Sequence, residues 1–368
     1  MRILEKISIQ NFKSIRTQEL ALGRLNVFIG GNGAGKSNLV QAFRFLREVV
    51  QQNLANYSFE RGADSLLYFG RKTSKFMEFF LEFGEASLSN GYRLRLTPTD
   101  AGSLMVNQET VYFHDRARFE NPIDEYIGLG SKESELTSTK SRIAGWVRRD
   151  LDTYRLYHFH DTSDSAPVKG PGPVDDNRFF RPDASNLAAF LYVLQKQFPD
   201  HFRNIEDAVR QIAPFFERFN LEPSRLTPDK IRLEWREKGS DAYFNATSMS
   251  DGTLRFICLA TLLLQPRLPA VVLLDEPELG LHPAAVSLLA DLMSSAATKT
   301  QVLVATQSVT LVNQFEPEQV WTVDRVDGQS VFRHLGKQDL TVWLERYGDY
   351  EGYGLGELWE KNVLGARP

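Results

Sequence analysis

Alternating apolar and polar residues open the chain, and their period of two predicts a half-buried β-strand over residues 3–12. The short apolar segment LNVFIG, residues 25–30, predicts a second, buried strand. A helix is predicted from Lys36, because the apolar positions after it recur at spacings of three and four residues, on one helical face. These positions are Leu39, Phe43, Leu46 and Val50.

The middle of the chain has a less regular pattern. Residues 68–114 predict β-structure, with a hairpin turn at Asn90-Gly91, because these residues tolerate the positive φ of a two-residue turn. Residues 120–150 are charged and lack a clear period, and TYRLYHF, residues 153–159, predicts another strand. The proline-rich segment 163–176 offers little to pack, so we expect a mobile surface loop there.

Helices and strands alternate in the last part of the chain. Helices are predicted within 186–198 and 204–216, followed by paired strands at 231–235 and 242–246. The elements predicted after them are a helix at 253–264, a strand at 270–274, a helix from Pro283, a strand at 301–306 and a hairpin turning at Asp327-Gly328. Short apolar strands that alternate with helices predict a largely parallel sheet covered on both faces. No heptad pattern is sustained between residues 50 and 245, so we expect no coiled-coil arm.

Composition narrows the class of protein. With 368 residues, of which 42% are apolar, the chain is expected to form one large domain with a smaller attached lobe. The net charge of −4 excludes a global positive field, so any nucleic-acid binding would use local patches. A single cysteine, Cys258, excludes a disulfide framework and favours a reducing compartment. Neither a signal peptide nor a segment of membrane-spanning length is apparent, so we expect a soluble cytoplasmic protein without membrane contact.

The segment GGNGAGKS, Gly30 to Ser37, fits the phosphate-loop pattern G-x-x-x-x-G-K-[ST]. It lies between a predicted strand and a predicted helix, where glycines let the backbone N–H groups and the helix N-terminus hold phosphates. Lys36 is expected to neutralise the β- and γ-phosphates of ATP, and the Ser37 hydroxyl to bind Mg²⁺. A glycine-rich structural turn would not explain the Lys-Ser pair. The residues expected to bind the nucleotide here are Asn32, Gly33, Ala34, Gly35, Lys36, Ser37 and Asn38.

Polar residues follow two of the predicted strands, at the edge where open α/β sheets bind ligands. Asp275 is the expected carboxylate for Mg²⁺, and Glu276 is expected to orient or deprotonate the attacking water. Gln307 follows the strand QVLVAT and is expected to reach the γ-phosphate or the water from the opposite side. Solvated strand ends are the alternative at both places, and the phosphate loop upstream disfavours it for the two carboxylates.

A second candidate for anion binding is SMSDGT, residues 248–253, directly before the apolar segment LRFICLATLLL. Ser250, Asp251 and Gly252 stand at the mouth of the predicted helix, where free backbone amides can hold an anion. Taken alone, the segment is better explained as an N-cap, in which Ser or Asp satisfies the first amides of a buried helix.

These motifs, in this order, resemble the ABC-type ATPase head of the SMC and RecF-like branch. The resemblance rests on NFKS near the N-terminus, GGNGAGKSN, SMSDGT, LLDEPELGLHP and ATQS, and it covers nearly the whole chain. It implies an α/β fold: a P-loop ATPase head with a mainly parallel core sheet, an antiparallel β subdomain and a helical insert. The nucleotide-binding core would comprise residues 1–50 and 246–335, with a β-rich and helical insert at 51–245 and an extension at 336–368.

In such heads SMSDGT occupies the position of the signature motif, which closes over the γ-phosphate bound by a second copy. The resemblance therefore implies a symmetric homodimer with two ATPs in its interface, and it leaves open whether the dimer joins a larger assembly. Ser250 and the Gly252 amide would contact the partner's nucleotide. Lys13 and Ser14 of NFKS would lie near the base or the phosphates, although so short a motif equally serves as a plain strand end.

The chain also departs from the family pattern. Asp251 gives a Ser-Asp-Gly signature where many relatives have Ser-Gly-Gly, which changes the charge of the loop. Gln307 stands where most ABC heads have a histidine, and because a glutamine carries no proton near neutral pH, slow turnover is expected. His160 and Asp161 are the nearest candidates for the missing Q-loop glutamine. His158, His160 and Asp161 together could also suggest a metal site. Successive side chains of a strand point to opposite faces, however, so three ligands on one short strand would not all reach the same metal ion.

The function that the resemblance implies is an ATP-driven switch. ATP closes the dimer, hydrolysis reopens it, and the closed form acts on a partner. That partner is expected to be a separately encoded effector, a nuclease or toxin, because compact bacterial ATPases of this kind stand beside such genes in phage-defence operons. Only 60 residues follow Ser308, too few for the nuclease domain of the overcoming-lysogenisation relatives.

Three alternatives compete with the switch. An ATPase subunit of a membrane transporter is disfavoured because Ser250 lies 214 residues after Lys36. A scaffold that binds ATP without hydrolysing it would not need Glu276. A RecF-like DNA-binding clamp in repair or maintenance would use local basic residues. The same residues could equally form an ordinary charged surface that faces solvent. The candidates are Arg93, Arg95, Lys140, Arg142, Arg148 and Arg149.

Overall fold

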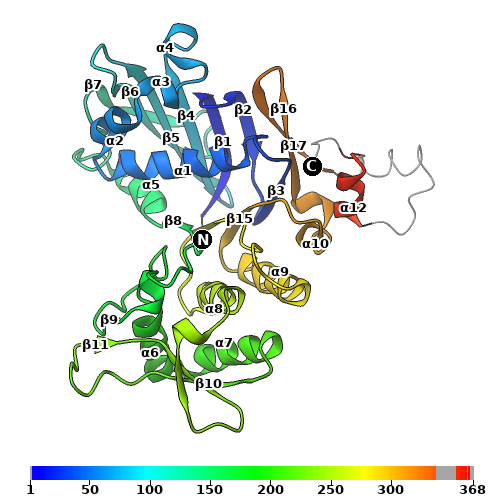
Figure 1. The fold of residues 1–368 in the computed structure, drawn as a ribbon. Coiled ribbons are helices and arrows are strands. Elements are labelled where there is room, and N and C mark those ends of the chain that lie inside the picture. Colours follow the sequence, from blue (N-terminus) through cyan, green and yellow to red (C-terminus); the bar gives the residue numbers. More distant parts are fainter. Residues whose placement is uncertain (1, 337–353, 363, 365–368) are drawn as a thin grey trace.

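The computed structural model describes residues 2–336, 354–362 and 364, and two large sheets with helices between and below them dominate it (Figure 1). Most of the extension expected at 336–368 lies outside the described residues, and within it helix α12 spans Leu355–Glu360.

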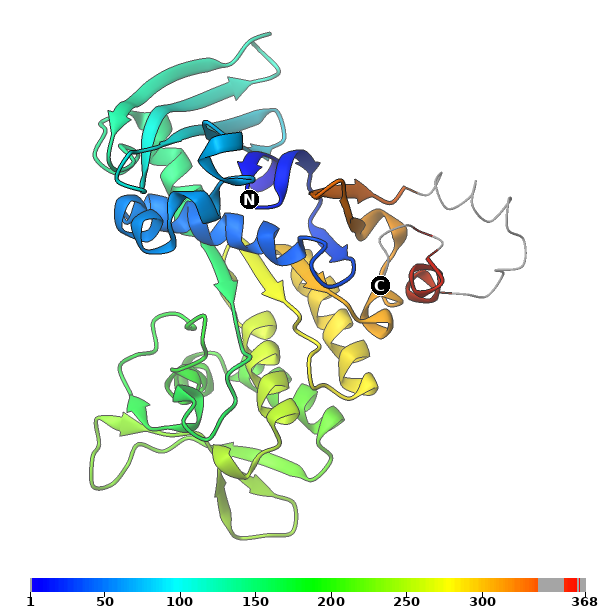
Figure 2. The ribbon, with the colours of Figure 1, turned by 45° about the horizontal axis from the view of Figure 1, so that its top comes forward.

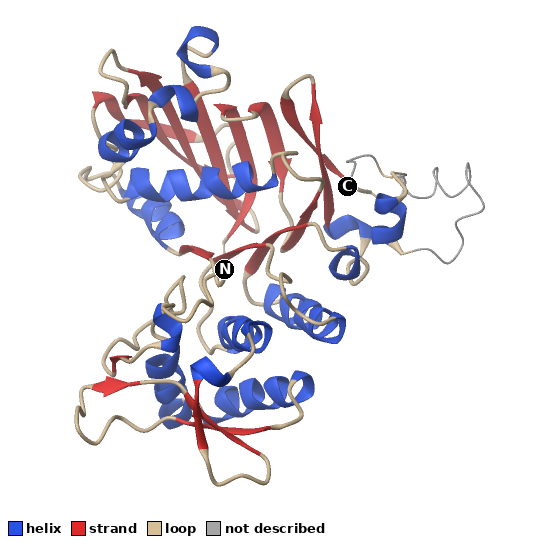
Figure 3. Cartoon of the chain, viewed as in Figure 1, coloured by secondary structure: helices blue, strands red, loops and turns tan. Residues whose placement is uncertain are grey.

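A six-stranded, mainly parallel sheet forms the centre of the molecule, as the apolar strand pattern predicted (Figure 3). Only its edge strand β17 runs antiparallel to its neighbour. Strands β3 and β15 are buried at every position, which explains why their sequences are almost continuously apolar. In sheet order the strands are β17 (Gln329–His334), β16 (Val320–Val326), β3 (Leu25–Ile29), β15 (Gln301–Thr306), β14 (Val271–Asp275) and β8 (Tyr154–Tyr157).

The second six-stranded sheet is antiparallel throughout. Its inward face is apolar, and its last strand, β7, is mostly exposed. In sheet order the strands are β2 (Ile15–Ala21), β1 (Ile3–Phe12), β4 (Met77–Glu85), β5 (Leu88–Pro98), β6 (Leu104–Asp115) and β7 (Ile123–Ser131).

Helix α1, Lys36–Val50, lies between the two sheets and contacts both (Figures 1 and 2). Its Phe45 ring lies 5.7 Å from Phe79 of the antiparallel sheet, and its Phe43 ring lies 6.1 Å from Tyr154 of the parallel sheet. The predicted helix therefore buries more than one stripe, because it has a sheet on each side.

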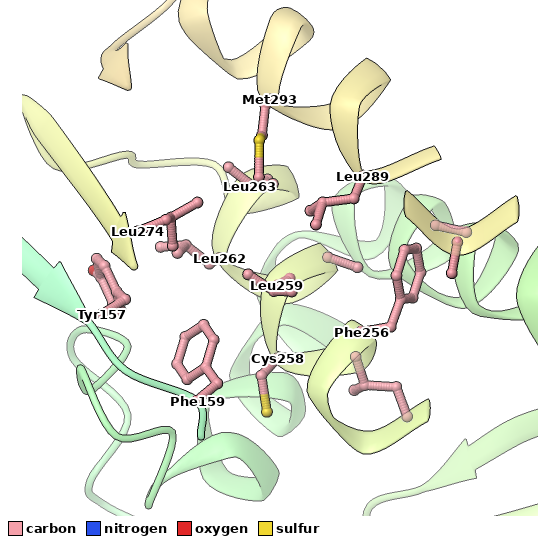
Figure 4. Packing of buried hydrophobic residues seen from close by; sticks show 14 of the residues in the cluster. Tyr157, Phe159, Phe256, Cys258, Leu259, Leu262, Leu263, Leu274, Leu289 and Met293 are labelled. Atoms are coloured by element: carbon pink, nitrogen blue, oxygen red, sulfur yellow. The ribbon is translucent and has the colours of Figure 1, made fainter. Parts of the chain in front are cut away.

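The opposite face of the parallel sheet is covered by α8 (Asp251–Leu264) and α9 (Pro283–Ala297), with α6 (Leu187–Gln197) and α7 (Pro199–Ile212) beyond them. Figure 4 shows Leu259 and Leu262 of α8 among Leu274 of the sheet and Leu289 of α9. Cys258 is buried in this core, where burial raises the pKa of its thiol to about 12, so it remains a neutral apolar group.

Short elements complete the structure. The helices are α2 (Leu54–Arg61), α3 (Ala63–Leu66), α4 (Gly70–Thr73), α5 (Arg142–Asp152) and α10 (Val309–Val312). The 3₁₀ turns are η1 (Pro167–Lys169), η2 (Ala246–Ser248) and η3 (Pro317–Gln319). One small sheet joins β10 (Phe216–Asn220), β12 (Glu234–Glu237) and β13 (Tyr243–Asn245), and another joins β9 (Gly172–Pro173) and β11 (Lys230–Ile231).

Two local predictions were wrong, and a third stretch holds elements that the sequence pattern did not predict. The hairpin turns at Ala86-Ser87, with Ala86 at φ 55°, whereas Gly91 lies inside β5, where a Cβ would come within 3.2 Å of Tyr112. Residues 120–150 hold β7 and α5, which the exposed, charged sequence concealed. The segment 163–176 is not an unpacked loop, because η1 inserts Val168 into the core.

The strands also cross the division expected from the sequence. Strands β1 and β2 lie in the antiparallel sheet, although they belong to the segment 1–50 assigned to the nucleotide-binding core. Conversely, β8 comes from the segment 51–245 assigned to the insert, yet it forms an edge of the parallel sheet. The division into a core at 1–50 and 246–335 with an insert therefore remains a prediction that the sheets do not follow.

The two sheets are joined by the buried side chain of Gln301, which is 0% exposed. Its amide accepts from Leu4 N at 3.0 Å and donates to Leu4 O at 2.9 Å and to Gly23 O at 2.7 Å. Replacing Gln301 with Leu leaves these groups without a partner, so we expect a loss of about 2–4 kcal/mol of unfolding free energy in chemical denaturation. Gln314→Leu, at an exposed amide, is the matched control, and equal stability of the two variants would contradict the prediction.

Candidate nucleotide-binding site

The phosphate loop runs from the end of β3 to the first residue of α1, as predicted. Gly35 needs to be glycine for two reasons: its φ is 120°, and a Cβ there would lie 1.9 Å from the hydroxyl of Ser330. No acidic residue occupies the first turn of α1, so the partial positive charge of its N-terminus is uncompensated. Asn32, Gly33 and Ser37 are exposed, which leaves the loop open to a ligand.

A buried hydrogen-bond network supports the loop from behind. The Ser14 hydroxyl lies 2.6 Å from the Ser330 hydroxyl and accepts from the Asn38 amide at 2.6 Å. Ser330 in turn donates to Ala34 O at 2.5 Å. Ser14, only 6% exposed, therefore positions the phosphate loop, and its hydroxyl is already engaged within the protein. No motif pointed to Ser330, which is 316 residues away from Ser14 along the chain.

The Lys36 ammonium group is folded across the loop and is 5% exposed. It donates to Gly30 O, and to Gly31 O at 3.1 Å. Burial lowers the pKa of Lys36, while the nearby carboxylates of Glu276, Asp275 and Glu278 oppose that shift. The ammonium thus faces the acidic ends of the neighbouring strands, the position from which it would contact a phosphate chain.

Glu276 and Gln307 come together at the carboxyl ends of β14 and β15, which are parallel neighbours. The Gln307 Nε2 donates to Glu276 Oε1, and the Glu276 N–H donates to Ala305 O at 2.8 Å. Glu276 has a φ of 44°, an uncommon conformation for a residue other than glycine and one that clusters at functional sites. The two residues expected to handle the attacking water therefore lie in direct contact.

A third carboxylate, Glu278, lies at the site, although the sequence analysis did not predict it. Its Oε1 accepts from the Thr306 hydroxyl at 2.5 Å and from the Gln307 N–H at 3.4 Å, whereas its Oε2 is buried without a hydrogen-bond partner. Burial is the main cause of its raised pKa. The one available signal was its place in Asp275-Glu276-Pro277-Glu278, two residues after the expected base.

Mg²⁺ fits the residues at this end of the sheet. Burial, followed by repulsion from Glu276, raises the pKa of Asp275, and the Lys36 ammonium faces three carboxylates. This excess of negative charge favours a divalent cation, which Ser37 and Asp275 would hold with oxygen ligands. The cation would neutralise charge on the transferred phosphate. Among the described residues no group of three His, Cys, Asp or Glu forms a metal site, so phosphate and water oxygens would complete the coordination.

A cavity of about 830 Å³ lies beside the phosphate loop, with Lys13, Ser14 and Asn38 on one side and Phe69 and Arg325 on the other. The Lys13 ammonium donates to Gln41 Oε1, and burial lowers its pKa. The space suits the nucleoside part of ATP, with Lys13 at its wall.

Ser250 caps α8, as expected for the segment taken alone. Its hydroxyl accepts from Thr253 N at 3.2 Å, and the residue is exposed. A Cβ at Gly252 would lie 2.5 Å from Gly280 O, so only glycine fits there. Within residues 2–336 no hydrogen bond joins this loop to the phosphate loop of the same copy.

The two candidates for the Q-loop position, both in the segment after β8, lie in different surroundings. His160 lies beside Asp275, where it opposes the raised pKa of that carboxyl, whereas Asp161 accepts from Ser163 Oγ at 2.7 Å. Arg255 of α8, 7% exposed, donates to Phe159 O at 2.9 Å and to His160 O at 3.2 Å. It also donates to Leu279 O. Arg255 therefore connects α8 to the segment after β8 and to the segment after Glu278.

No helix in the described part of the chain is long and apolar enough to cross a membrane.

Comparisons with known proteins agree with this geometry. The family described as "AAA domain, putative AbiEii toxin, Type IV TA system" matches residues 25–313, which is most of the chain. The chain is 27% identical over 222 residues to the DNA replication and repair protein RecF of Renibacterium salmoninarum, covering 55% of each sequence. It thus spans about half the length of that curated relative.

Solved structures support the fold. A crystal structure of an Smc head bound to the C-winged helix domain of ScpA superposes with a TM-score of 0.62 at 18% identity, covering 92% of this chain and 99% of that one. An Smc head domain from Pyrococcus furiosus with an extended coiled coil, bound to the C-terminal domain of ScpA, gives a TM-score of 0.60 at 16% identity, covering 95% and 100%. The predicted α/β head fold is therefore confirmed. The chain belongs to the AAA ATPase domain family that carries the AbiEii description, and it has the fold of an SMC head.

Proposed function

We propose that the protein is an ATP-hydrolysing switch in which two copies close around shared nucleotides and reopen after hydrolysis. The observation that supports it best is that, within residues 2–336, no hydrogen bond joins the phosphate loop to the signature loop of the same copy. Lys36 and Glu276 lie at the sheet edge, whereas Ser250 is exposed and Gly252 is half-buried at the start of α8. We infer that each of these two places is one half of a nucleotide sandwich. A symmetric pair would bring each half against its complement.

Within each half, this chain's own residues have distinct roles. Lys36 and the α1 N-terminus bind and orient the phosphates. Glu276 accepts a proton from the attacking water, and the Gln307 amide holds that carboxylate in place. Because an amide relays no proton near neutral pH, hydrolysis is expected to be slow, which suits a switch better than a pump.

Lys169 compensates the unusual charge of the signature loop. Its side chain is 5% exposed, and its ammonium lies 3.3 Å from Asp251 Oδ1 and 3.9 Å from Asp164 Oδ1. An uncompensated Asp251 would repel the γ-phosphate that the loop must approach. The pair therefore lets a Ser-Asp-Gly sequence serve where relatives carry no charge.

Removing that compensation should weaken dimer closure specifically. We expect Lys169→Met to weaken ATP-dependent dimerisation about tenfold in analytical ultracentrifugation, without changing ATP binding to the monomer. Adding Asp251→Asn should restore dimerisation, because it removes the uncompensated charge. Lys299→Met, at an exposed lysine, is the control. Unchanged dimerisation in Lys169→Met would contradict this role.

The closed dimer acts on a separately encoded effector, a nuclease or toxin, in anti-phage defence. The family description names a "putative AbiEii toxin" of a type IV toxin–antitoxin system, which links the family, though not a particular partner, to such systems. The test is affinity purification from the native host with and without Glu276→Gln. A nuclease or toxin enriched with this variant, which we expect to stay closed, would support the proposal, and its absence from both samples would contradict it.

A RecF-like role on DNA is the second candidate, favoured by the 27% identity to RecF. The expected basic residues divide into two groups: Arg93 and Arg95 lie over aromatic rings, and Arg95 also pairs with Glu78 at 3.4 Å. The remaining four, Lys140, Arg142, Arg148 and Arg149, are exposed on and just before α5. DNA affinity that falls steeply with salt would support this role, and no binding at low salt would remove it.

A further inference from the structure

A cavity of about 460 Å³ lies between the second half of α1 and the edge strand β8. It shares no residue with the phosphate loop, and Arg47 on its wall stands eleven residues after Lys36, about 16 Å along the helix axis. Its floor is apolar and well packed. The floor residues, each less than 9% exposed, are Phe43, Tyr154, Leu156 and Leu273.

Arginine side chains outnumber carboxylates on the walls of this cavity, where Glu48 and Asp183 also stand. Arg44 and Arg47 line it, and Arg155 is close enough to depress the pKa of Arg47, although burial is the larger cause. Neither Arg44 nor Arg47 forms a hydrogen bond or ion pair with a carboxylate within residues 2–336. A third wall arginine, Arg181, is paired with Asp176 at 2.5 Å. Like charges held together in this way are stabilised by an anion between them.

His158 provides a second, independent sign of a missing partner. Its Nε2 is buried without a hydrogen-bond partner, while its backbone N–H donates to Pro182 O at 2.9 Å. Burial lowers the pKa of His158 to about 4, so the ring is neutral at pH 7 and holds a single N–H. An unpaired buried polar atom costs stability, and His158 is one of the residues that line the cavity.

We propose that this cavity binds a small phosphorylated molecule with a flat apolar part, of the size of a mononucleotide. Arg44 and Arg47 would hold the phosphate, because guanidinium groups match its geometry. The Phe43 and Tyr154 side of the floor would bury the apolar part. The volume lies within the range of small-molecule sites. The site is distinct from the ATP site and does not depend on the proposed switch.

The test uses the full chain with Lys36→Ala, so that the phosphate loop does not contribute, and titrates AMP by calorimetry. We expect AMP to bind with a dissociation constant below about 1 mM, and adenosine and inorganic phosphate each to bind about tenfold more weakly, because each supplies half of the contacts. Arg47→Ala and, separately, the exposed Arg44→Ala should each weaken AMP binding about tenfold. Arg16→Ala, at an exposed arginine on β2, should leave it unchanged.

Two results would overturn the proposal. One is no AMP binding at all, and the other is AMP binding that persists in the double variant Arg44→Ala, Arg47→Ala. A 5′-phosphorylated oligonucleotide that binds in an Arg47-dependent manner while AMP does not would assign the cavity to a nucleic-acid end instead. Thermal unfolding of Arg44→Ala, whose side chain is exposed, should match that of the parent, which separates lost binding from lost folding.

Discussion

Lys36→Ala is expected to abolish ATP binding by the isolated protein. The ammonium is buried and is the one lysine charge that faces Asp275, Glu276 and Glu278. Without it, the phosphates of ATP would be held by backbone amides and Mg²⁺ beside three carboxylates, with no ammonium group from Lys36 between them. Truncating a buried charge that pairs with a ligand costs about 2–5 kcal/mol, so we expect affinity to fall by about 30-fold to several thousand-fold.

Equilibrium dialysis with ATP and Mg²⁺ measures this loss directly. Lys299→Ala removes an exposed lysine and should bind ATP like the parent chain. Because Lys36 donates only to Gly30 O and Gly31 O, its removal should leave the thermal midpoint within a few degrees of the parent. ATP binding within twofold of the parent in Lys36→Ala would contradict the assignment of the phosphate loop.

Glu276→Gln is expected to bind ATP normally, to block hydrolysis and to accumulate as an ATP-bound dimer. Glutamine keeps the shape of the side chain, and its oxygen can still accept from Gln307 Nε2. It cannot take a proton from water, and loss of general-base catalysis lowers turnover by about 10²- to 10⁴-fold. With the reopening step blocked, ATP should hold the two copies together.

Phosphate release measures the loss of hydrolysis. Size-exclusion chromatography with light scattering, with and without ATP, measures the accumulation of the dimer. Glu60→Gln, at an exposed carboxylate, is the matched control. Normal hydrolysis in Glu276→Gln would mean that Glu276 is not the base. Blocked hydrolysis without a dimer would contradict the expectation that bound ATP holds two copies together.

The sequence predicted the parts of the fold that depend on local pattern. The alternating strands, the start of α1 at Lys36 and the Asp327-Gly328 turn were found where expected, since each is encoded within a few residues. It failed where tertiary contacts decide the structure. Gly91 has the conformational freedom of a turn residue but is required inside a strand, beneath Tyr112. Strand β7 is an exposed edge, so no apolar alternation marks it.

The candidate site shows the same division. Lys36, Asp275 and Glu276 were predicted because a phosphate loop and a strand end have recognisable sequences. Ser330 and Arg255 could not be predicted, because each acts through contacts with distant segments, Ser330 on Ala34 and Arg255 on Phe159. Such partners become visible only when the sheet order is known.

The central claim is that each ATP lies between two copies of the chain, and mixing two inactive variants tests it most directly. Ser250→Arg should block closure but keep its own phosphate loop, whereas Lys36→Ala lacks ATP but keeps its signature loop. A mixed dimer holds one intact composite site, and the arginine lies at the other, nucleotide-free site. We predict that each variant alone is inactive and that ATP hydrolysis reappears on mixing, with a maximum near equal amounts. Hydrolysis by Ser250→Arg alone at the parent rate, or none in any mixture, would contradict the account.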